Sequence, residues 1–138
     1  PLIPDNAGEI IVTLRKNYPR TFNFDFDIKL LYGKWRAVSL EGLPEGAVDL
    51  THPLVTPTYL TFEEKGILVS EGYFGNETGR YSTEDKKIYT LIDKNRLDME
   101  VTALAAGTAR VKFNPTGIDF GGLIPGDTKT ITIVLKKQ

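Results

Sequence analysis

Apolar and polar residues alternate along most of this 138-residue chain, and helical periodicity is almost absent. The clearest case runs from Phe22 to Leu30, where every second residue is aromatic or aliphatic and those between are polar or charged. A period of two places the apolar side chains on one face of a strand and the polar ones on the other. The pattern therefore predicts a protein built from strands, with one strand over residues 22–30.

Eight further strands are predicted beyond that segment, all short and bounded by residues that favour turns. We expect them at residues 34–40, 57–63, 66–74, 79–84, 87–92, 96–103, 107–113 and 129–136. Most connectors are the size of hairpin loops and contain Gly, Asn or Asp, which accept a positive φ. Successive strands joined this tightly are expected to pair antiparallel, because a parallel pair needs a crossover of about a dozen residues or more.

Eight antiparallel strands can close into an up-and-down barrel whose interior holds side chains or one small ligand. A sandwich with Greek-key crossings has the same periodicity and is the alternative. Residues 41–56 and 114–128 are rich in Gly and Pro and are predicted to be loops. We therefore expect an all-β fold, an antiparallel up-and-down eight-stranded barrel.

Composition narrows the classes of function. The chain has 17 basic and 18 acidic residues, so it offers no electrostatic reason to bind nucleic acid or an anionic membrane. No run approaches 18 consecutive apolar residues, which predicts no transmembrane segment. The absence of cysteine excludes disulfides, thiolate metal sites and a cysteine nucleophile. The chain starts at Pro1, and we interpret it as a processed or trimmed form from which a signal peptide or lipid anchor could have been removed.

The sequence Gly33-Lys34-Trp35 stands at the start of the first of the eight predicted strands and contains the only tryptophan. It resembles the G-x-W signature of the lipocalins and their calycin relatives, in which the tryptophan closes one end of the barrel. The resemblance extends over about residues 31–138, through the stretches Tyr32–Trp35, Asp49–Thr51, Pro57–Phe62 and Gly72–Asn76. It is strongest to small bacterial lipocalin-like domains that are secreted or lipid-anchored.

This resemblance implies a lipocalin-like barrel domain at residues 31–138 and a location in the cell envelope, whether periplasmic, secreted or lipid-anchored. It also implies a basic residue on a late strand that stacks on the tryptophan. Arg110 and Lys136 are the two candidates for that residue. The T-D-Y-like triplet of the family is absent.

Residues 1–30 precede this domain and are expected to form an N-terminal β extension, a strand or hairpin with strands at 9–15 and 22–30. We expect at least one of the two to add to a barrel edge or to mediate self-association through residues 9–30, because an exposed apolar strand invites aggregation. Residues 2–16 also align without a gap with 123–137 and share six of fifteen positions. That similarity reflects either a related strand, such as the last strand of an earlier domain, or convergence.

Six residues are candidates for a ligand pocket. They are Trp35, Tyr59, Tyr73, Tyr81, Tyr89 and Met99. Aromatic side chains suit an apolar or sugar-like ligand because their faces are large and rigid. The alternative is that they fill the core or girdle the barrel. Tyr73 and Phe74 are adjacent in a predicted strand, so we expect them on opposite faces and not in one cavity.

Candidates for catalysis are few. His52 is the only histidine, and Asp49 is close to it, but no serine elbow or paired-carboxylate signature accompanies them. Asp25 and Asp27 are expected on one face of the strand over 22–30, as its solvated side. One histidine without cysteine makes a zinc site improbable. We expect no catalysis, no metal and no cofactor.

These observations favour a non-catalytic lipocalin-like domain of the cell envelope that binds a small apolar ligand inside the barrel. The alternative is a packed barrel that serves as an interaction or accessory module for a protein or polysaccharide partner. A barrel interior filled by side chains would favour the second hypothesis over the first.

Overall fold

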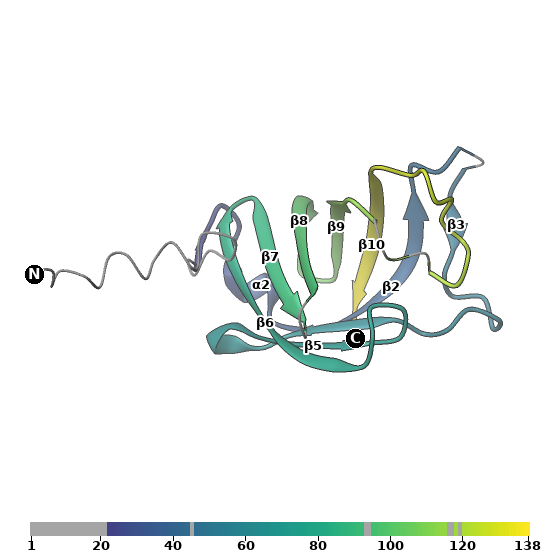
Figure 1. The fold of residues 1–138 in the computed structure, drawn as a ribbon. Helices are drawn as coiled ribbons and strands as arrows, with labels where there is room; N and C mark the ends of the chain where they lie inside the picture. The colour runs from purple at the N-terminus through teal and green to yellow at the C-terminus, as the bar shows by residue number, and fades with distance from the viewer. Residues whose placement is uncertain (1–21, 45, 93–94, 116–117, 119) are drawn as a thin grey trace, which may run out of the picture.

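The chain forms a closed barrel of eight antiparallel strands (Figure 1). The computed structural model describes residues 22–44, 46–92, 95–115, 118 and 120–138. The barrel strands are β2 (Gly33–Glu41), β4 (Tyr59–Phe62), β5 (Ile67–Glu71), β6 (Glu77–Asp85), β7 (Lys87–Ile92), β8 (Asn95–Leu104), β9 (Thr108–Phe113) and β10 (Ile131–Lys137). Each pairs with the next along the chain, and β10 returns to pair with β2. The predicted up-and-down barrel is therefore confirmed, and the sandwich is excluded.

One extra strand, β1 (Phe22–Phe24), runs parallel to the second half of β6. It occupies the edge of β6 beyond the point where pairing with β5 ends at Arg80. The expectation that an N-terminal strand adds to the barrel is confirmed for this segment. Residues 9–15, and the first half of the internal alignment at 2–16, lie outside the described residues.

The predicted strand over 22–30 is wrong beyond its first residues. After β1 the chain turns and forms the short helix α2 (Ile28–Leu31), so the predicted boundary after residue 30 falls inside a helix. The Asp27 carboxylate accepts a hydrogen bond from the Lys29 amide at 3.0 Å and caps this helix. A side chain that accepts hydrogen bonds from nearby backbone amides stabilises a helix start over an extended strand. Here the Asp27 bond makes the backbone helical from residue 28, although apolar and polar residues still alternate there.

Side chains from alternating positions fill the barrel. The buried ones on the barrel strands include Trp35, Ala37, Leu60, Phe62, Leu68, Tyr81, Ile88, Met99, Val101, Ala109, Val111, Phe113, Ile131, Ile133 and Leu135. Burial of each large side chain stabilises the fold by about 1.5–3 kcal/mol. The period of two seen in the sequence is therefore the division between the interior and the outer face.

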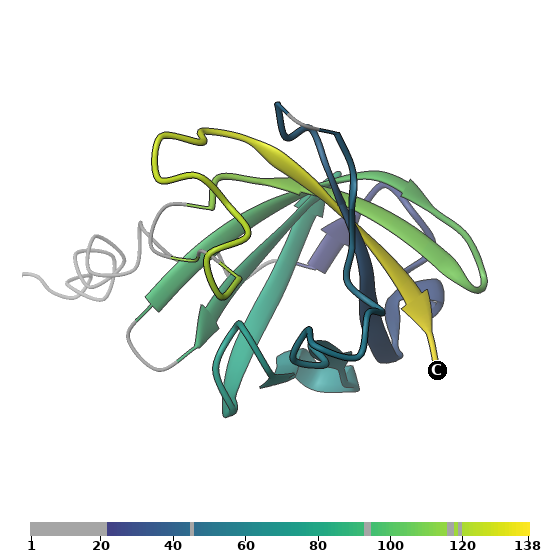
Figure 2. The ribbon, with the colours of Figure 1, turned by 90° about the vertical axis from the view of Figure 1, so that its right-hand side faces the viewer.

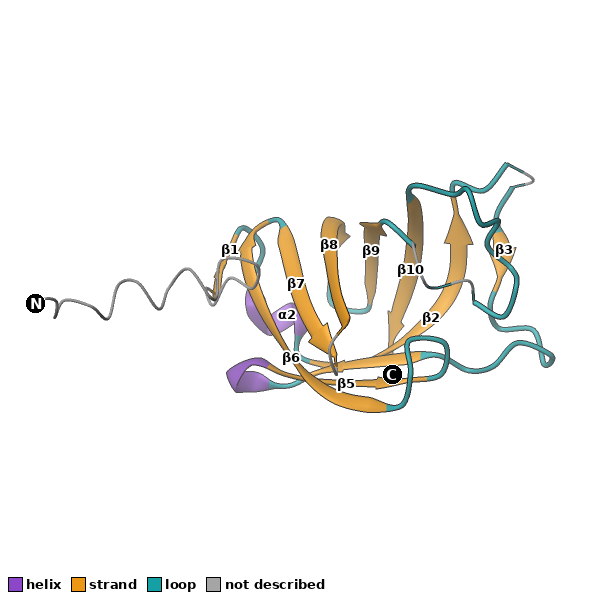
Figure 3. Ribbon diagram, in the orientation of Figure 1, coloured by secondary structure: helices purple, strands orange, loops and turns teal. Residues whose placement is uncertain are grey.

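The two ends of the barrel differ because the connections alternate between them. The α2 end carries α2, the helical turn η3 (Glu64–Gly66) and the short turns after β6 and β8. The loop end carries residues 42–58, 72–76 and 114–130, with the short strand β3 (Val48–Asp49) paired to β2. Figure 3 shows the two helices on the side opposite the long loops, and Figure 2 shows those loops from the loop side.

Candidate functional site

The α2 end is sealed around Trp35, whose side chain is fully buried. Gly33, at φ +125°, makes the turn into β2, and the indole Nε1 donates to the Leu31 carbonyl at 2.8 Å. Lys137 lies with its Nζ 4.9 Å from the centroid of the indole and donates to the Leu30 carbonyl at 2.8 Å. The indole N–H and the Lys137 ammonium thus each have a hydrogen-bond partner, and Lys137 covers the indole.

The basic residue on the tryptophan is Lys137, so both Arg110 and Lys136 were wrong candidates. Lys136 is exposed because it alternates with the inward-facing Leu135. Arg110 lies on the outer surface, where its guanidinium pairs with the Glu41 carboxylate.

Trp35, Tyr81 and Met99 face the interior and are at most 2 % exposed. Tyr81 packs edge-on against Phe62 with ring centroids 5.1 Å apart, and its hydroxyl donates to the Glu63 carbonyl at 2.6 Å. Burial raises the pKa of Tyr81, so the hydroxyl stays protonated and keeps donating. These three candidate residues are therefore packing residues of the core.

The loop end is closed by four aromatic side chains, which we call the aromatic plug: Tyr73, Phe74, Phe113 and Phe120. Phe120 is 1 % exposed, and its ring centroid lies 5.2 Å from that of Tyr73 and 5.3 Å from that of Phe74. Gly121 follows at φ +67°, and a Cβ there would lie 2.9 Å from the Tyr73 ring. Only glycine fits between the loop and the ring without a shift.

Tyr73 and Phe74 both contact Phe120, which overturns the expectation that they point to opposite faces. The reason is that β5 ends at Glu71, so both residues belong to a turn, where side chains do not alternate. The Tyr73 hydroxyl accepts a hydrogen bond from the Thr56 amide at 3.1 Å and ties this turn to the neighbouring loop.

Beside the plug lies a groove of about 490 Å³, which we call the loop-end groove. It lies between two loop segments and is lined by Leu43, Pro44, Gly46, Ala47, Val48, Gly122, Leu123 and Pro125. None of these described lining residues is charged. Leu43, Val48 and Leu123 are half-buried and rest on the core. Sequence reasoning missed this groove because its two walls come from loops about 80 positions apart.

Tyr59 and Tyr89 project from the outer surface, so the six candidates do not line one pocket. Tyr59 alternates with the buried Leu60, and the Lys34 Nζ lies 4.4 Å from its ring centroid. Tyr89 has the Arg96 guanidinium 5.7 Å from its ring centroid. The alternative expectation, that these residues fill the core or girdle the barrel, describes five of the six. Trp35, Tyr81 and Met99 lie in the core, and Tyr59 and Tyr89 lie on the outer wall of the barrel.

The catalytic candidates are engaged in local turns. The His52 Nδ1 accepts from the Leu54 amide at 3.1 Å. The Asp49 carboxylate accepts from both the amide and the hydroxyl of Thr51, at 2.8 and 2.6 Å, and the hydroxyl bond is the main cause of its lowered pKa. Asp25 and Asp27 do not share a strand face, since both follow β1.

In the described part of the chain, no group of three or more His, Cys, Asp or Glu residues could hold a metal ion. No helix among the described residues is long and apolar enough to cross a membrane.

Comparisons with known proteins agree with this geometry at the level of the fold. No protein-family model matches the chain, and a search of curated proteins finds no match. Among solved structures, the chain is similar to a lipocalin-like protein from Bacteroides uniformis, with a TM-score of 0.52 and 14% sequence identity. The match covers 79% of this chain and 99% of that chain. At this identity the likeness concerns the fold alone.

Proposed function

We propose that this chain, which has a lipocalin-like fold, is a non-catalytic binding domain that holds a small apolar ligand in the loop-end groove. The observation that carries the proposal is the groove itself. Its volume of about 490 Å³ falls within the range of about 300–1,000 Å³ that is common for small-molecule sites. Its walls are aliphatic and uncharged, so they favour an apolar ligand that leaves water.

The filled interior argues against the ligand that was expected inside the barrel, so we place the ligand at the loop end, where the groove remains open. Trp35, Phe62, Tyr81 and Met99 occupy the space that an internal ligand would need. Interiors are packed to near-crystalline density, so a ligand there would have to displace side chains that already contact one another. A ligand in the groove needs no such rearrangement.

The proposal is tested by titrating the purified chain with an apolar fluorescent probe that absorbs outside the emission band of tryptophan, while recording Trp35 emission. Trp35 lies at the opposite end of β2, about 25 Å from Leu43 by the rise of a strand. We expect saturable probe binding that leaves Trp35 emission unchanged. Quenching of Trp35 would instead place the probe in the barrel interior and contradict the groove.

Two variants sharpen this test. Leu123→Asn replaces a half-buried wall residue of the groove, and we expect the probe to bind about tenfold more weakly. Leu91→Asn is the matched control, a half-buried leucine on the outer face of β7. Equal affinity in both variants would refute the groove as the binding site. Native mass spectrometry of gently purified protein would show whether a small molecule accompanies the chain.

A second candidate function is an interaction module for a protein partner. It is favoured by Leu54, a large aliphatic side chain that is 88% exposed at the loop end. The His52 and Asp49 hydrogen bonds hold the turn that presents it. Affinity capture with the wild type, Leu54→Asn and Leu123→Asn separates the two functions. A protein captured by all but Leu54→Asn would support this candidate, and identical capture by Leu54→Asn would refute it.

We also propose that the protein acts in the cell envelope. The support is the resemblance of Gly33-Lys34-Trp35 and the neighbouring stretches to small secreted or lipid-anchored bacterial domains. Fractionation of cells that carry the native gene, with immunodetection of the chain, tests the location. Detection in the cytosolic fraction alone would contradict it.

A further inference from the structure

We propose that the outer face of β7, β8 and β9 carries a second binding site, which accepts a neutral sugar unit with Tyr89 as its stacking surface. A groove of about 260 Å³ lies there, which we call the outer groove. Its lining includes Lys87, Tyr89, Asp98, Glu100 and Lys112. The outer groove runs along the barrel wall and reaches Asn114 and Thr130 near the loop end, but it shares no lining residue with the loop-end groove. This inference is therefore independent of the proposed apolar ligand.

The strand register brings these residues together. Lys87 lies opposite Glu100 across β7 and β8, and Glu100 lies opposite Lys112 across β8 and β9. Tyr89 lies opposite Asp98 in the adjoining row. Side chains at these positions share one face, because all are two residues apart along their strands. The result is a row of three charged groups beside one aromatic ring.

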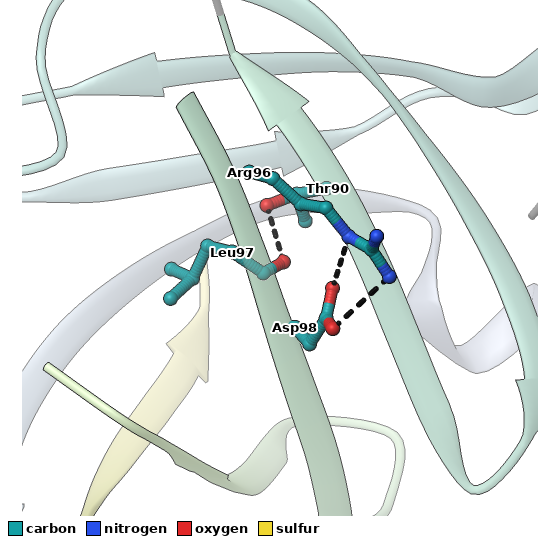
Figure 4. A network of polar contacts seen from close by, with 4 residues as sticks. All are labelled: Thr90, Arg96, Leu97 and Asp98. Atoms are coloured by element: carbon teal, nitrogen blue, oxygen red, sulfur yellow. Dashed lines mark hydrogen bonds and ion pairs between the residues drawn. The ribbon is translucent and has the colours of Figure 1, made fainter. Parts of the chain in front are cut away.

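The Tyr89 ring is held in place by its neighbours. Arg96 donates to both carboxylate oxygens of Asp98, at 2.9 and 3.1 Å, on the outer face of β8 (Figure 4). Between β7 and β8, the buried Thr90 hydroxyl donates to the Leu97 carbonyl at 2.8 Å and ties the two strands together (Figure 4). The guanidinium lies over the Tyr89 ring and is not part of the outer groove lining. A ring fixed on one side before binding loses little freedom when a ligand stacks on it.

The polar groups around the ring fit a ligand with many hydroxyls. Sugar hydroxyls both donate and accept, and the outer groove offers lysine donors beside carboxylate acceptors. Among the described residues, Lys87, Glu100 and Lys112 form no ion pair within 4.0 Å, so their polar tips can reach a ligand. A sugar ring also has an apolar C–H face that suits an aromatic surface.

The charge balance selects a neutral ligand. Asp98 is paired with Arg96, and the remaining charged groups, Lys87, Glu100 and Lys112, alternate in sign across the three strands. A phosphate or sulfate group would meet Glu100 between the two lysines, and a cation would meet a lysine on either side of Glu100. A neutral polyol carries no charge, so neither the lysines nor the carboxylates repel it.

The test is a glycan array of neutral and anionic oligosaccharides probed with the full chain, followed by titration of the bound species by NMR. We expect binding to neutral glycans that falls about tenfold in Tyr89→Ala. Tyr59→Ala is the matched control, because Tyr59 is another half-buried outer tyrosine with a cation over its ring and is outside the outer groove. Competition by free monosaccharides separates recognition of one sugar unit from recognition of a longer chain.

Three outcomes overturn the inference. They are binding to no neutral glycan, equal loss in Tyr89→Ala and Tyr59→Ala, and binding restricted to anionic glycans. Circular dichroism and thermal unfolding of both variants show that each is folded. Arg96→Ala provides a further check, since it removes the group that covers the ring but leaves the ring itself. We expect it to lower affinity about threefold without changing which glycans bind.

Discussion

The α2 end and the loop end close the same barrel by different means. At the α2 end, Trp35 is anchored by its own hydrogen bond to Leu31 and covered by Lys137, which is itself bonded to Leu30. At the loop end, the aromatic plug relies mainly on ring packing, and a groove remains open beside it. Hydrogen bonds impose one geometry, whereas apolar contacts are non-directional. The α2 end is therefore held in one geometry, whereas the loop end leaves open the groove in which we propose that a ligand binds.

The largest effect is expected at the α2 end. Trp35→Ala should lower the free energy of unfolding by about 4 kcal/mol, because it leaves a large cavity and removes the partner of the Leu31 carbonyl. Urea unfolding followed by circular dichroism measures the change. A loss below about 2 kcal/mol would mean that the α2 end collapses around the missing indole and is not rigid.

A smaller loss is expected from the corresponding change in the aromatic plug. Phe120→Ala should lower the free energy of unfolding by about 3 kcal/mol. This loss is smaller than that of Trp35→Ala because loops can relax into the vacated space more readily than strands. Phe120→Ala should also speed exchange of amide hydrogens on the last residues of β9, next to Phe113, as the plug loosens. If Phe120→Ala destabilises the protein as much as Trp35→Ala, the proposed contrast between the ends fails.

The smallest of the three effects concerns Lys137. Lys137→Met removes the charged donor to the Leu30 carbonyl and the contact with the indole, so we expect a loss of about 1.5 kcal/mol. Lys136→Met is the matched control. Because the Lys136 side chain is exposed, we expect this change to alter the free energy of unfolding by less than about 0.5 kcal/mol. Equal effects of the two changes on urea unfolding would show that Lys137 does not support the seal.

Much of the barrel was predictable because the interior of a barrel imposes a period of two on every strand. The eight strands, their antiparallel order and the extra edge strand follow from that period and from the short turns. The identity of Lys137 was also accessible. The inward positions Ile131, Ile133 and Leu135 continue to residue 137, but the predicted strand ended one residue too early.

Other errors in the predicted strand ends came from local hydrogen bonds and turns, which the alternation of apolar and polar residues does not reveal. The alternation over 22–30 continues through Asp27, yet its carboxylate caps α2 and ends the extended segment. The turn at Tyr73 and Phe74 likewise interrupts a pattern that was expected to run to residue 74. In both cases a few hydrogen bonds or a turn decide the backbone, while the apolar pattern changes little.

The sequence by itself determined the fold class, the strand order and the residues that face inward, because alternation and turn chemistry act over a few neighbouring residues. Only the tertiary structure decided where the surface is hollowed and which residues meet there. The aromatic plug joins the turn at Tyr73 to Phe120, the loop-end groove joins Val48 to Leu123, and the outer groove depends on the register of three strands. These contacts arise from barrel closure, which brings together residues that no local pattern connects.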